Sequence, residues 1–142
     1  MKLFVLMLLL FVPVMAQERR ELKSSPVMVV SLEEIIPSSR PTTSIKIKLY
    51  NMGDLPIKSI MFDISFVDAN RGGDVDKIRG LLGDPKSKSI LLKPNQSKTI
   101  EYDMNYYAPN GWMVNSKSFR FRNIVFADNS MWINPEILNE KK

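Results

Sequence analysis

The segment Ile57–Asp68, IKSIMFDISFVD, decides the fold class of this chain. In an extended backbone every second side chain lies on the same face, and here one face is apolar throughout. Its members are Ile60, Phe62, Ile64 and Phe66. Polar residues such as Asp63 and Ser65 alternate with them on the other face, which can meet water. The segment therefore predicts a central strand of a sheet with one buried face.

Further short strands, with turn residues between them, account for most of the remaining chain. Alternation or β-branched residues predict strands at 27–32, 44–50, 89–92, 98–106, 118–126 and 131–133, whereas 76–82 fits either a short strand or a helical turn. The strands recur about every ten residues, and no amphipathic helix separates them. We expect an all-β fold, an antiparallel β-sandwich of about seven strands with an immunoglobulin-like or fibronectin type III-like topology.

One strand carries a change of hydrophobic phase. The apolar residues of 118–126 are Phe119, Phe121, Ile124 and Phe126. The first two share a face, but the last two fall in the opposite phase. A β-bulge near Arg122 and Asn123 would return all four side chains to the core.

The first 16 residues have the pattern of a secretory signal peptide. Lys2 precedes an apolar run that ends at Val12, and Ala16 fits the position before a cleavage site. The run is shorter than the roughly 20 residues that a membrane-spanning helix needs, so we expect cleavage after Ala16 and no transmembrane segment in the mature chain. The remainder divides into a flexible leader at 17–26, the sandwich domain at 27–134 and a solvated tail at 135–142.

Composition excludes several classes of function. The 142 residues contain no histidine and no cysteine, which removes Ser-His-Asp and Cys-His catalysis and most zinc and copper sites. Glu101 and Asp103 share the outward face of one predicted strand, and a solvated face explains them better than a catalytic pair. The net charge of +5 is spread along the chain rather than gathered in a basic run with aromatic residues. We expect no enzyme, no cofactor and no nucleic-acid partner.

The absence of cysteine also bears on location. An exported domain of this size without disulfides is more typical of the bacterial periplasm than of the eukaryotic extracellular space. The basic balance permits attraction to acidic surfaces of a cell envelope. We therefore predict a secreted or periplasmic bacterial protein.

Four local patterns, in this order, resemble a known family. They are KLYNMGDLPIKSIMFDISFVDA at 48–69, a glycine-bearing loop, ILLKPNQSKTIEY at 90–102 and FRNIVFADNSMW at 121–132. The chain is similar in these segments to FxLYD-type bacterial extracytoplasmic domains, although Asn95 and Asn129 stand where that pattern usually has glycine. Asparagine tolerates the left-handed backbone conformation that such turns need. The resemblance implies a β-sandwich, an envelope location and an accessory or interaction role, and it carries over no catalytic residue.

Two sets of residues are candidates for binding an envelope protein or glycan. Tyr106, Tyr107 and Trp112 flank a turn, where exposed rings could contact a sugar or a partner protein. The alternative is that Tyr106 and Trp112 fold inward and close the end of the sandwich. The second set consists of Lys46, Lys48, Arg120 and Arg122. These side chains point outward on two strands and would form a basic stripe if the strands were neighbours, and otherwise they belong to ordinary solvated faces.

An alternative function is that of a calcium- or small-ligand-dependent binding module. Its possible metal ligands are Asp68, Asn70, Asp74 and Asp76. Asp68, Asn70 and Gly73 match positions of a calcium-binding loop, but Gly72 and Arg79 stand where that loop has ligands. Aspartate and glycine are also common in hairpin loops that bind nothing.

Overall fold

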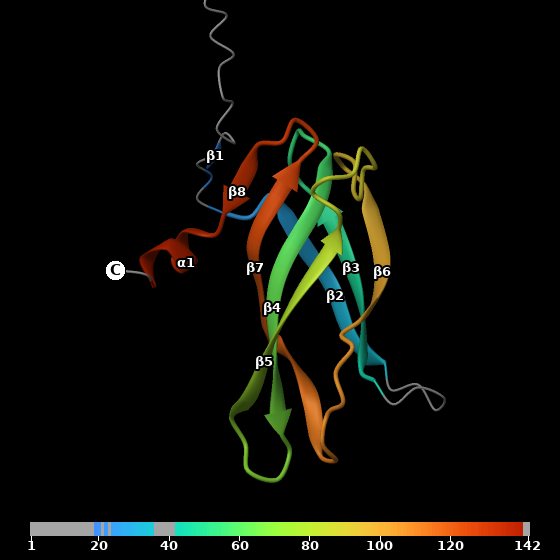
Figure 1. Ribbon diagram of the computed structural model, residues 1–142, viewed down its shortest axis with the longest axis vertical. Coiled ribbons are helices and arrows are strands. Elements are labelled where there is room, and N and C mark those ends of the chain that lie inside the picture. The colour runs from blue at the N-terminus through green and yellow to red at the C-terminus, as the bar shows by residue number, and fades with distance from the viewer. Residues whose placement is uncertain (1–18, 21, 23, 36–41, 141–142) are drawn as a thin grey trace, which may run out of the picture.

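The computed structural model describes residues 19–20, 22, 24–35 and 42–140. Within these residues the chain forms eight strands and one short helix (Figure 1). They are β1 (Arg19–Arg20), β2 (Val27–Ile35), β3 (Ser44–Asn51), β4 (Ile57–Asp68), β5 (Asp74–Gly83), β6 (Ser97–Asp103), β7 (Trp112–Phe126), β8 (Met131–Ile133) and α1 (Pro135–Asn139). The predicted signal peptide, residues 1–16, lies outside the described residues.

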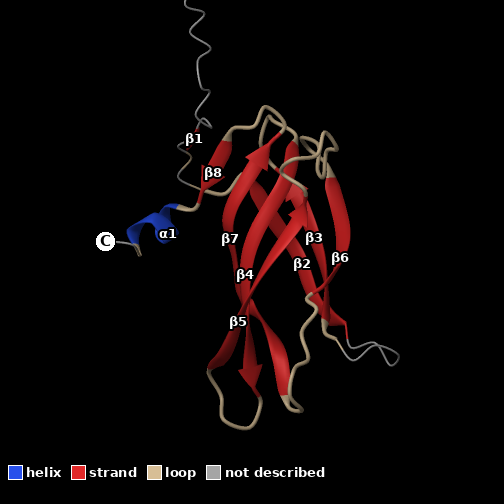
Figure 2. Ribbon diagram, viewed as in Figure 1, coloured by secondary structure: helices blue, strands red, loops and turns tan. Residues whose placement is uncertain are grey.

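The strands form two sheets, which face each other (Figure 2). One sheet has the order β1-β8-β7-β4-β5 and the other the order β2-β3-β6. Neighbouring strands are antiparallel, except that the two residues of β1 run parallel to β8. The predicted all-β class with two antiparallel sheets is confirmed. Because β3 and β4 belong to different sheets, the turn between them crosses the sandwich and does not close a hairpin.

The core lies between the sheets and is centred on β4. The alternate residues Ile60, Phe62, Ile64 and Phe66 are at most 1% exposed. They meet Ile45, Ile47 and Leu49 of β3 in one hydrophobic cluster. The outer face of β4 differs from the prediction, because Asp63 and Ser65 are only 1% and 5% exposed. Cations of β5 and β7 approach Asp63 and form the site described below.

The predicted bulge in β7 is confirmed. Asn123 lies opposite Met61, and Phe121 lies opposite Phe62, so Arg122 is an extra residue without a partner in the ladder. The resulting phase change buries Phe121, Ile124 and Phe126 together, at 9%, 0% and 1% exposure.

Some strand boundaries differ from the prediction. The undecided segment 76–82 belongs to β5. The predicted strand at 89–92 is wrong, since only Leu92 forms a bridge, and its single partner is Ile57. The strand predicted at 98–106 ends at Asp103, because Asn105 takes a left-handed conformation with φ of 49° and breaks the extended backbone.

Both ends of the described chain contact the five-stranded sheet. The indole Nε1–H of Trp132 in β8 donates a hydrogen bond to the carbonyl of Leu22, over 3.0 Å. In the region predicted as a solvated tail, the short helix α1 begins at Pro135, and its N-cap Asn134 accepts a hydrogen bond from the backbone N–H of Glu136. No helix in the described part of the chain is long and apolar enough to cross a membrane.

Candidate functional site

A buried carboxylate lies at the centre of the outer face of the five-stranded sheet. Asp63 of β4 lies directly opposite Arg79 of β5 and Arg120 of β7. Its Oδ1 accepts a hydrogen bond from Arg79 Nε at 3.2 Å, and its Oδ2 accepts one from Arg122 Nη1 at 2.7 Å. Two further cations approach Oδ2, Arg120 Nη2 at 3.6 Å and Lys77 Nζ at 4.0 Å. We call these five residues the Asp63 cluster.

Strand register and the β7 bulge bring these side chains together. Lys77 and Arg79 are two residues apart on β5, so both point to the same face of the sheet. Arg120 reaches Asp63 from the register position opposite it on β7. Because Arg122 is the extra residue of the bulge, it can turn toward the outer face beside Asn123 and bind Asp63 as well.

The cluster leaves positive charge at the surface. Burial by itself raises the pKa of Asp63, but hydrogen bonds from Arg122 and Arg79, together with the attraction of their charges, outweigh it and hold the pKa below the ordinary value of 3.8. The carboxylate is therefore ionised at neutral pH and neutralises one of four cations. The side chains of Lys77 and Arg79 are 59% and 56% exposed, so their charges can act on a partner.

The chain itself supplies a second carboxylate to this face. Glu140, which follows α1, accepts a hydrogen bond through Oε1 from Arg120 Nη1 at 2.6 Å. This bond lowers the pKa of Glu140 below its ordinary value. The face thus already accommodates a carboxylate that arrives from outside the sheet.

The four cations considered for a basic stripe lie on two different sheets. Arg120 and Arg122 belong to the Asp63 cluster, but Lys46 and Lys48 lie exposed on β3 of the other sheet, so the four side chains form no common stripe. Outward side chains of two packed sheets point in opposite directions. Lys46 also lies opposite Glu33 and Glu101, which reduces its influence on a partner.

The aromatic loop mostly faces inward. The ring of Tyr106 stacks on Phe66 with centroids 5.0 Å apart, and Trp112 lies 6.4 Å from the same ring. The hydroxyl of Tyr106 donates a hydrogen bond to Asp76 Oδ2 at 2.6 Å, which raises the pKa of Tyr106. Tyr107 alone of the three is strongly exposed, at 68%. The structure therefore favours the alternative in which Tyr106 and Trp112 close the end of the sandwich.

The residues considered as possible calcium ligands have separate hydrogen-bond partners. Asp68 Oδ1 accepts a hydrogen bond from the backbone N–H of Asn70 at 2.9 Å, as in an ordinary turn. Asp74 is bound by the amide of Asn115, and Asp76 by the hydroxyl of Tyr106. In the described part of the chain, no three carboxylates are grouped so that they could hold a metal ion.

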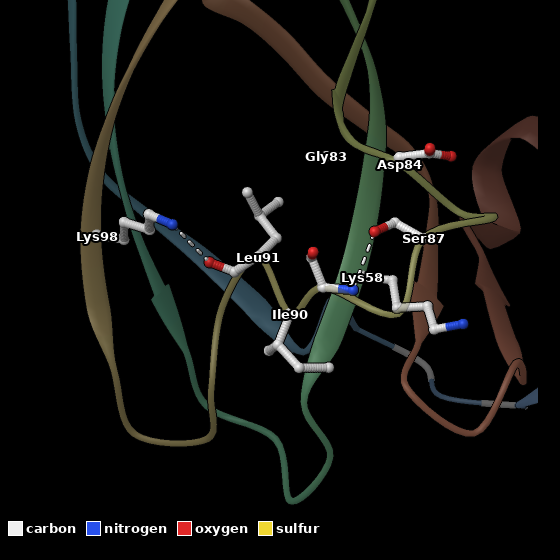
Figure 3. Close-up of a pocket in the computed structure, with 8 residues that line it drawn as sticks. Lys58, Gly83, Asp84, Ser87, Ile90, Leu91 and Lys98 are labelled. Atoms are coloured by element: carbon white, nitrogen blue, oxygen red, sulfur yellow. Dashed lines mark hydrogen bonds between the residues drawn. The ribbon is translucent and has the colours of Figure 1, made fainter.

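The surface depressions offer fewer available charged groups for a ligand than the Asp63 cluster. Figure 3 shows one of about 330 Å³, lined by Lys58, Gly83, Asp84, Ser87, Ser89, Ile90, Leu91 and Lys98. Its two lysines already have oxygen partners, since Lys98 donates to the carbonyl of Leu91 and Lys58 to the side chain of Asn129. A second depression, of about 400 Å³, is lined by Ser24, Ser25, Phe119, Arg120, Phe121, Trp132, Asn134, Pro135 and Glu136.

Sequence inspection missed three members of the cluster, Asp63, Lys77 and Arg79, as well as Glu140. The sequence held two signals for this cluster. Asp63 is a charged residue in the middle of the central strand, and two other segments each carry a pair of cations two residues apart, Lys77 with Arg79 and Arg120 with Arg122. These signals become specific only when the strands that flank β4 are known.

No family model, curated protein or solved structure matches this chain. Its fold and site define a class in physical terms, an all-β sandwich with four cations around one buried carboxylate on the outer face of its larger sheet.

Proposed function

We propose that this chain is a non-enzymatic interaction module that binds anionic groups through the Asp63 cluster. The observation that carries the proposal is that one buried carboxylate holds Arg79 and Arg122 by hydrogen bonds and has two further cations within 4.0 Å, while Lys77 and Arg79 remain more than half exposed. Side chains that are already held in place lose less conformational entropy when a ligand binds. Guanidinium groups also present several donors in a plane, which suits carboxylates, phosphates and sulfates.

A binding role suits this chemistry better than a catalytic one. A general acid or base works best when its pKa lies near the operating pH. The pKa of Asp63 is held below 3.8, and both of its oxygens accept hydrogen bonds from arginines. The carboxylate therefore acts as an anchor for the cations.

The proposed location is the bacterial cell envelope, in the periplasm or outside the cell. It is supported by the signal-peptide pattern of residues 1–16 and by the resemblance to FxLYD-type domains. The turn residues Asn95 and Asn129 have φ of 58° and 66°, as the resemblance requires of residues in place of glycine. The expected partner is an acidic envelope protein or glycan.

Strand order supports an immunoglobulin-like or fibronectin type III-like assignment. In such folds the first, second and fifth strands share one sheet, while the third and the last two share the other. Here β2, β3 and β6 form one sheet, and β4, β7 and β8 belong to the other. On this assignment β5 is the strand between the third and fifth, and it pairs with β4.

The experiment is affinity capture of envelope material by the purified protein. Three baits are compared: the wild type, the double variant Lys77→Gln/Arg79→Gln, and the matched variant Lys46→Gln/Lys48→Gln. Each variant removes two positive charges. The first variant removes both from the Asp63 cluster, and the matched variant removes both from the opposite sheet. Melting temperatures establish that all three baits are folded.

The proposal predicts that a specific protein or glycan is retained by the wild type and by the opposite-sheet variant and is lost with Lys77→Gln/Arg79→Gln. Raising the salt concentration to about 0.5 M should release it, because the Debye length then falls below about 5 Å. Equal retention by all three baits, or equal loss with both variants, would exclude the Asp63 cluster as the contact surface.

A further inference from the structure

We propose that the free edge of β5 binds an extended acidic peptide as an additional strand, with carboxylates at alternate positions facing Lys77 and Arg79. This inference rests on the proposed function, because the two cations belong to the Asp63 cluster. It adds the form of the partner, a polypeptide segment paired to the sheet through its backbone.

The edge is long and accessible. β5 is the last strand of the five-stranded sheet, and β4 is its only neighbour among the described strands (Figure 1). It spans ten residues, and the side chains from Asp74 to Lys77 are all exposed. The backbone groups on the far side of such a strand are a template for pairing with another chain. One of them, the N–H of Lys77, donates to Asp76 Oδ1 at 2.9 Å and would exchange this bond for one to the peptide.

The outer face of β5 selects for acidic residues. Lys77 lies opposite Ser65 of β4, and Arg79 lies opposite Asp63. A strand added beside β5 would place its own alternate residues next to these two cations, at the short distances of cross-strand pairs. Two acidic residues separated by one residue would match them.

A buried hydroxyl at this position also lacks a partner. The side chain of Ser65 is 5% exposed, and its Oγ forms no hydrogen bond to the described residues. A depression of about 280 Å³ next to it is lined by Ser65, Asp74, Val75, Asp76 and Lys77. The Oγ of Ser65 is itself shielded from solvent, and two aspartates line the depression, so a carboxylate of the ligand is not expected there. A neutral residue of the peptide fits this end of β5.

The charge of β5 changes from negative at its start to positive at Lys77 and Arg79. This change restricts where the acidic residues of the peptide can lie. Asp74 and Asp76 lie at its start, where Asp74 accepts a hydrogen bond from Asn115 and Asp76 from Tyr106. The acidic residues of the ligand must therefore lie opposite Lys77 and Arg79, and neutral residues opposite the start of β5. Between the two acidic positions an apolar side chain would contact Ile78, which packs against the core.

A second copy of this chain is a poorer occupant. Pairing β5 with β5 of another molecule would bring Lys77 and Arg79 close to the same two cations, and like charges in facing strands are destabilising. Charged residues on an edge strand also oppose unselective strand pairing. The same two side chains thus repel a copy of the chain and attract an acidic strand.

The probe is a fluorescein-labelled peptide, Thr-Val-Glu-Val-Glu-Val-Thr, whose binding to the purified protein is followed by fluorescence anisotropy. A peptide with lysines in place of the glutamates tests charge. A third peptide keeps both glutamates but carries a methyl group on every backbone nitrogen, so that it cannot donate hydrogen bonds to a strand. We expect the first to bind at least about tenfold more tightly than either of the others.

Two protein variants test the residues. Lys77→Gln/Arg79→Gln should weaken binding by about tenfold, whereas Lys86→Gln/Lys88→Gln, with the same charge change on the exposed loop after β5, should alter it by less than about twofold.

The outcomes separate the two proposals. If the N-methylated acidic peptide binds as well as the parent, the face attracts anions without pairing a strand, and the strand inference is wrong while the proposed function stands. If none of the peptides binds although an envelope component is captured through Lys77 and Arg79, the partner is not an acidic strand. If capture does not depend on these two cations, the proposed function itself fails.

Discussion

Asp63 is a charge buried on the side of a sheet that ordinarily faces solvent. Removing a carboxylate from water is unfavourable, and it is tolerated here because Arg79 and Arg122 donate hydrogen bonds to its two oxygens. The arginines keep contact with water on their other sides, so the group is not an isolated ion pair in a dry interior. Asp63 therefore couples the stability of the sheet to the position of the surface cations.

Replacing Asp63 by asparagine should lower the free energy of unfolding at pH 7 by about 2–3 kcal/mol, because a charged partner is lost and the cations remain crowded. The pKa of Asp63 is lowered in the folded state, so its contribution is present above the unfolded value of about 3.9 and is lost as pH falls through the folded value. Urea unfolding of wild type and variant should show a stability difference at pH 7 that shrinks below pH 3.8. Equal stability at pH 7 would contradict this.

Gly80 is required by the ring beneath it. A Cβ added at this position would lie within 3.0 Å of three ring atoms of Phe62, which is fully buried. That ring cannot move away freely, because Tyr102 and Phe119 contact it at centroid distances of 5.3 and 5.1 Å. Gly80→Ala should therefore lower the free energy of unfolding by about 1–3 kcal/mol.

The double variant Gly80→Ala/Phe62→Leu is the control for this mechanism. Leucine is smaller than phenylalanine. Gly80→Ala should therefore lower the free energy of unfolding less in the Phe62→Leu background than in the wild type. In a double-mutant cycle measured by urea unfolding, the double variant should be less destabilised than the sum of the single variants. Additive effects would mean that contact with Phe62 is not the cause.

Among the elements, β4 was predicted with its observed bounds and β5 was the least predictable. In β7 the phase change in 118–126 was sufficient to place a bulge at Arg122, but the strand begins at Trp112 and not at 118. In β5 the apolar residues are few, and Gly80 interrupts them, so alternation did not distinguish a strand from a helical turn. The segment 89–92 was misassigned because an apolar run does not reveal how many backbone partners it will find.

Deletion of Arg122 tests the bulge as an element. Without the extra residue, Phe121 and Ile124 cannot both face the core, since a shift of one residue turns a strand over. We expect the deletion to abolish cooperative thermal unfolding, whereas Arg122→Ala should cost about 1–2 kcal/mol through its lost bond to Asp63. Near-UV circular dichroism and thermal melting distinguish the two. A folded, cooperative deletion variant would mean that the bulge can move along β7.

At the scale of the whole molecule, alternation along single strands was enough to predict a sandwich but not its site. The Asp63 cluster joins residues of β5, β4 and β7, and no single-strand pattern says that these three strands are neighbours. The same limitation left open whether Lys46 and Lys48 adjoin Arg120 and Arg122, which lie on the other sheet. Charge spacing identified outward positions correctly, but the assignment of strands to sheets decides which outward positions meet.

The thermal stability of the whole protein should report which ligand class it binds. A ligand that binds only the folded state adds stability, about 2.7 kcal/mol at 100 times its dissociation constant, which raises Tm by several degrees in a domain of this size. Poly-L-glutamate at low salt should therefore raise Tm of the wild type, with a smaller rise for Lys77→Gln/Arg79→Gln and none at about 0.5 M salt. Millimolar calcium should leave Tm unchanged, because Asp68, Asp74 and Asp76 are engaged in separate hydrogen bonds. A rise with calcium and none with poly-L-glutamate would reverse the assignment and favour the loop before β5 as the binding site.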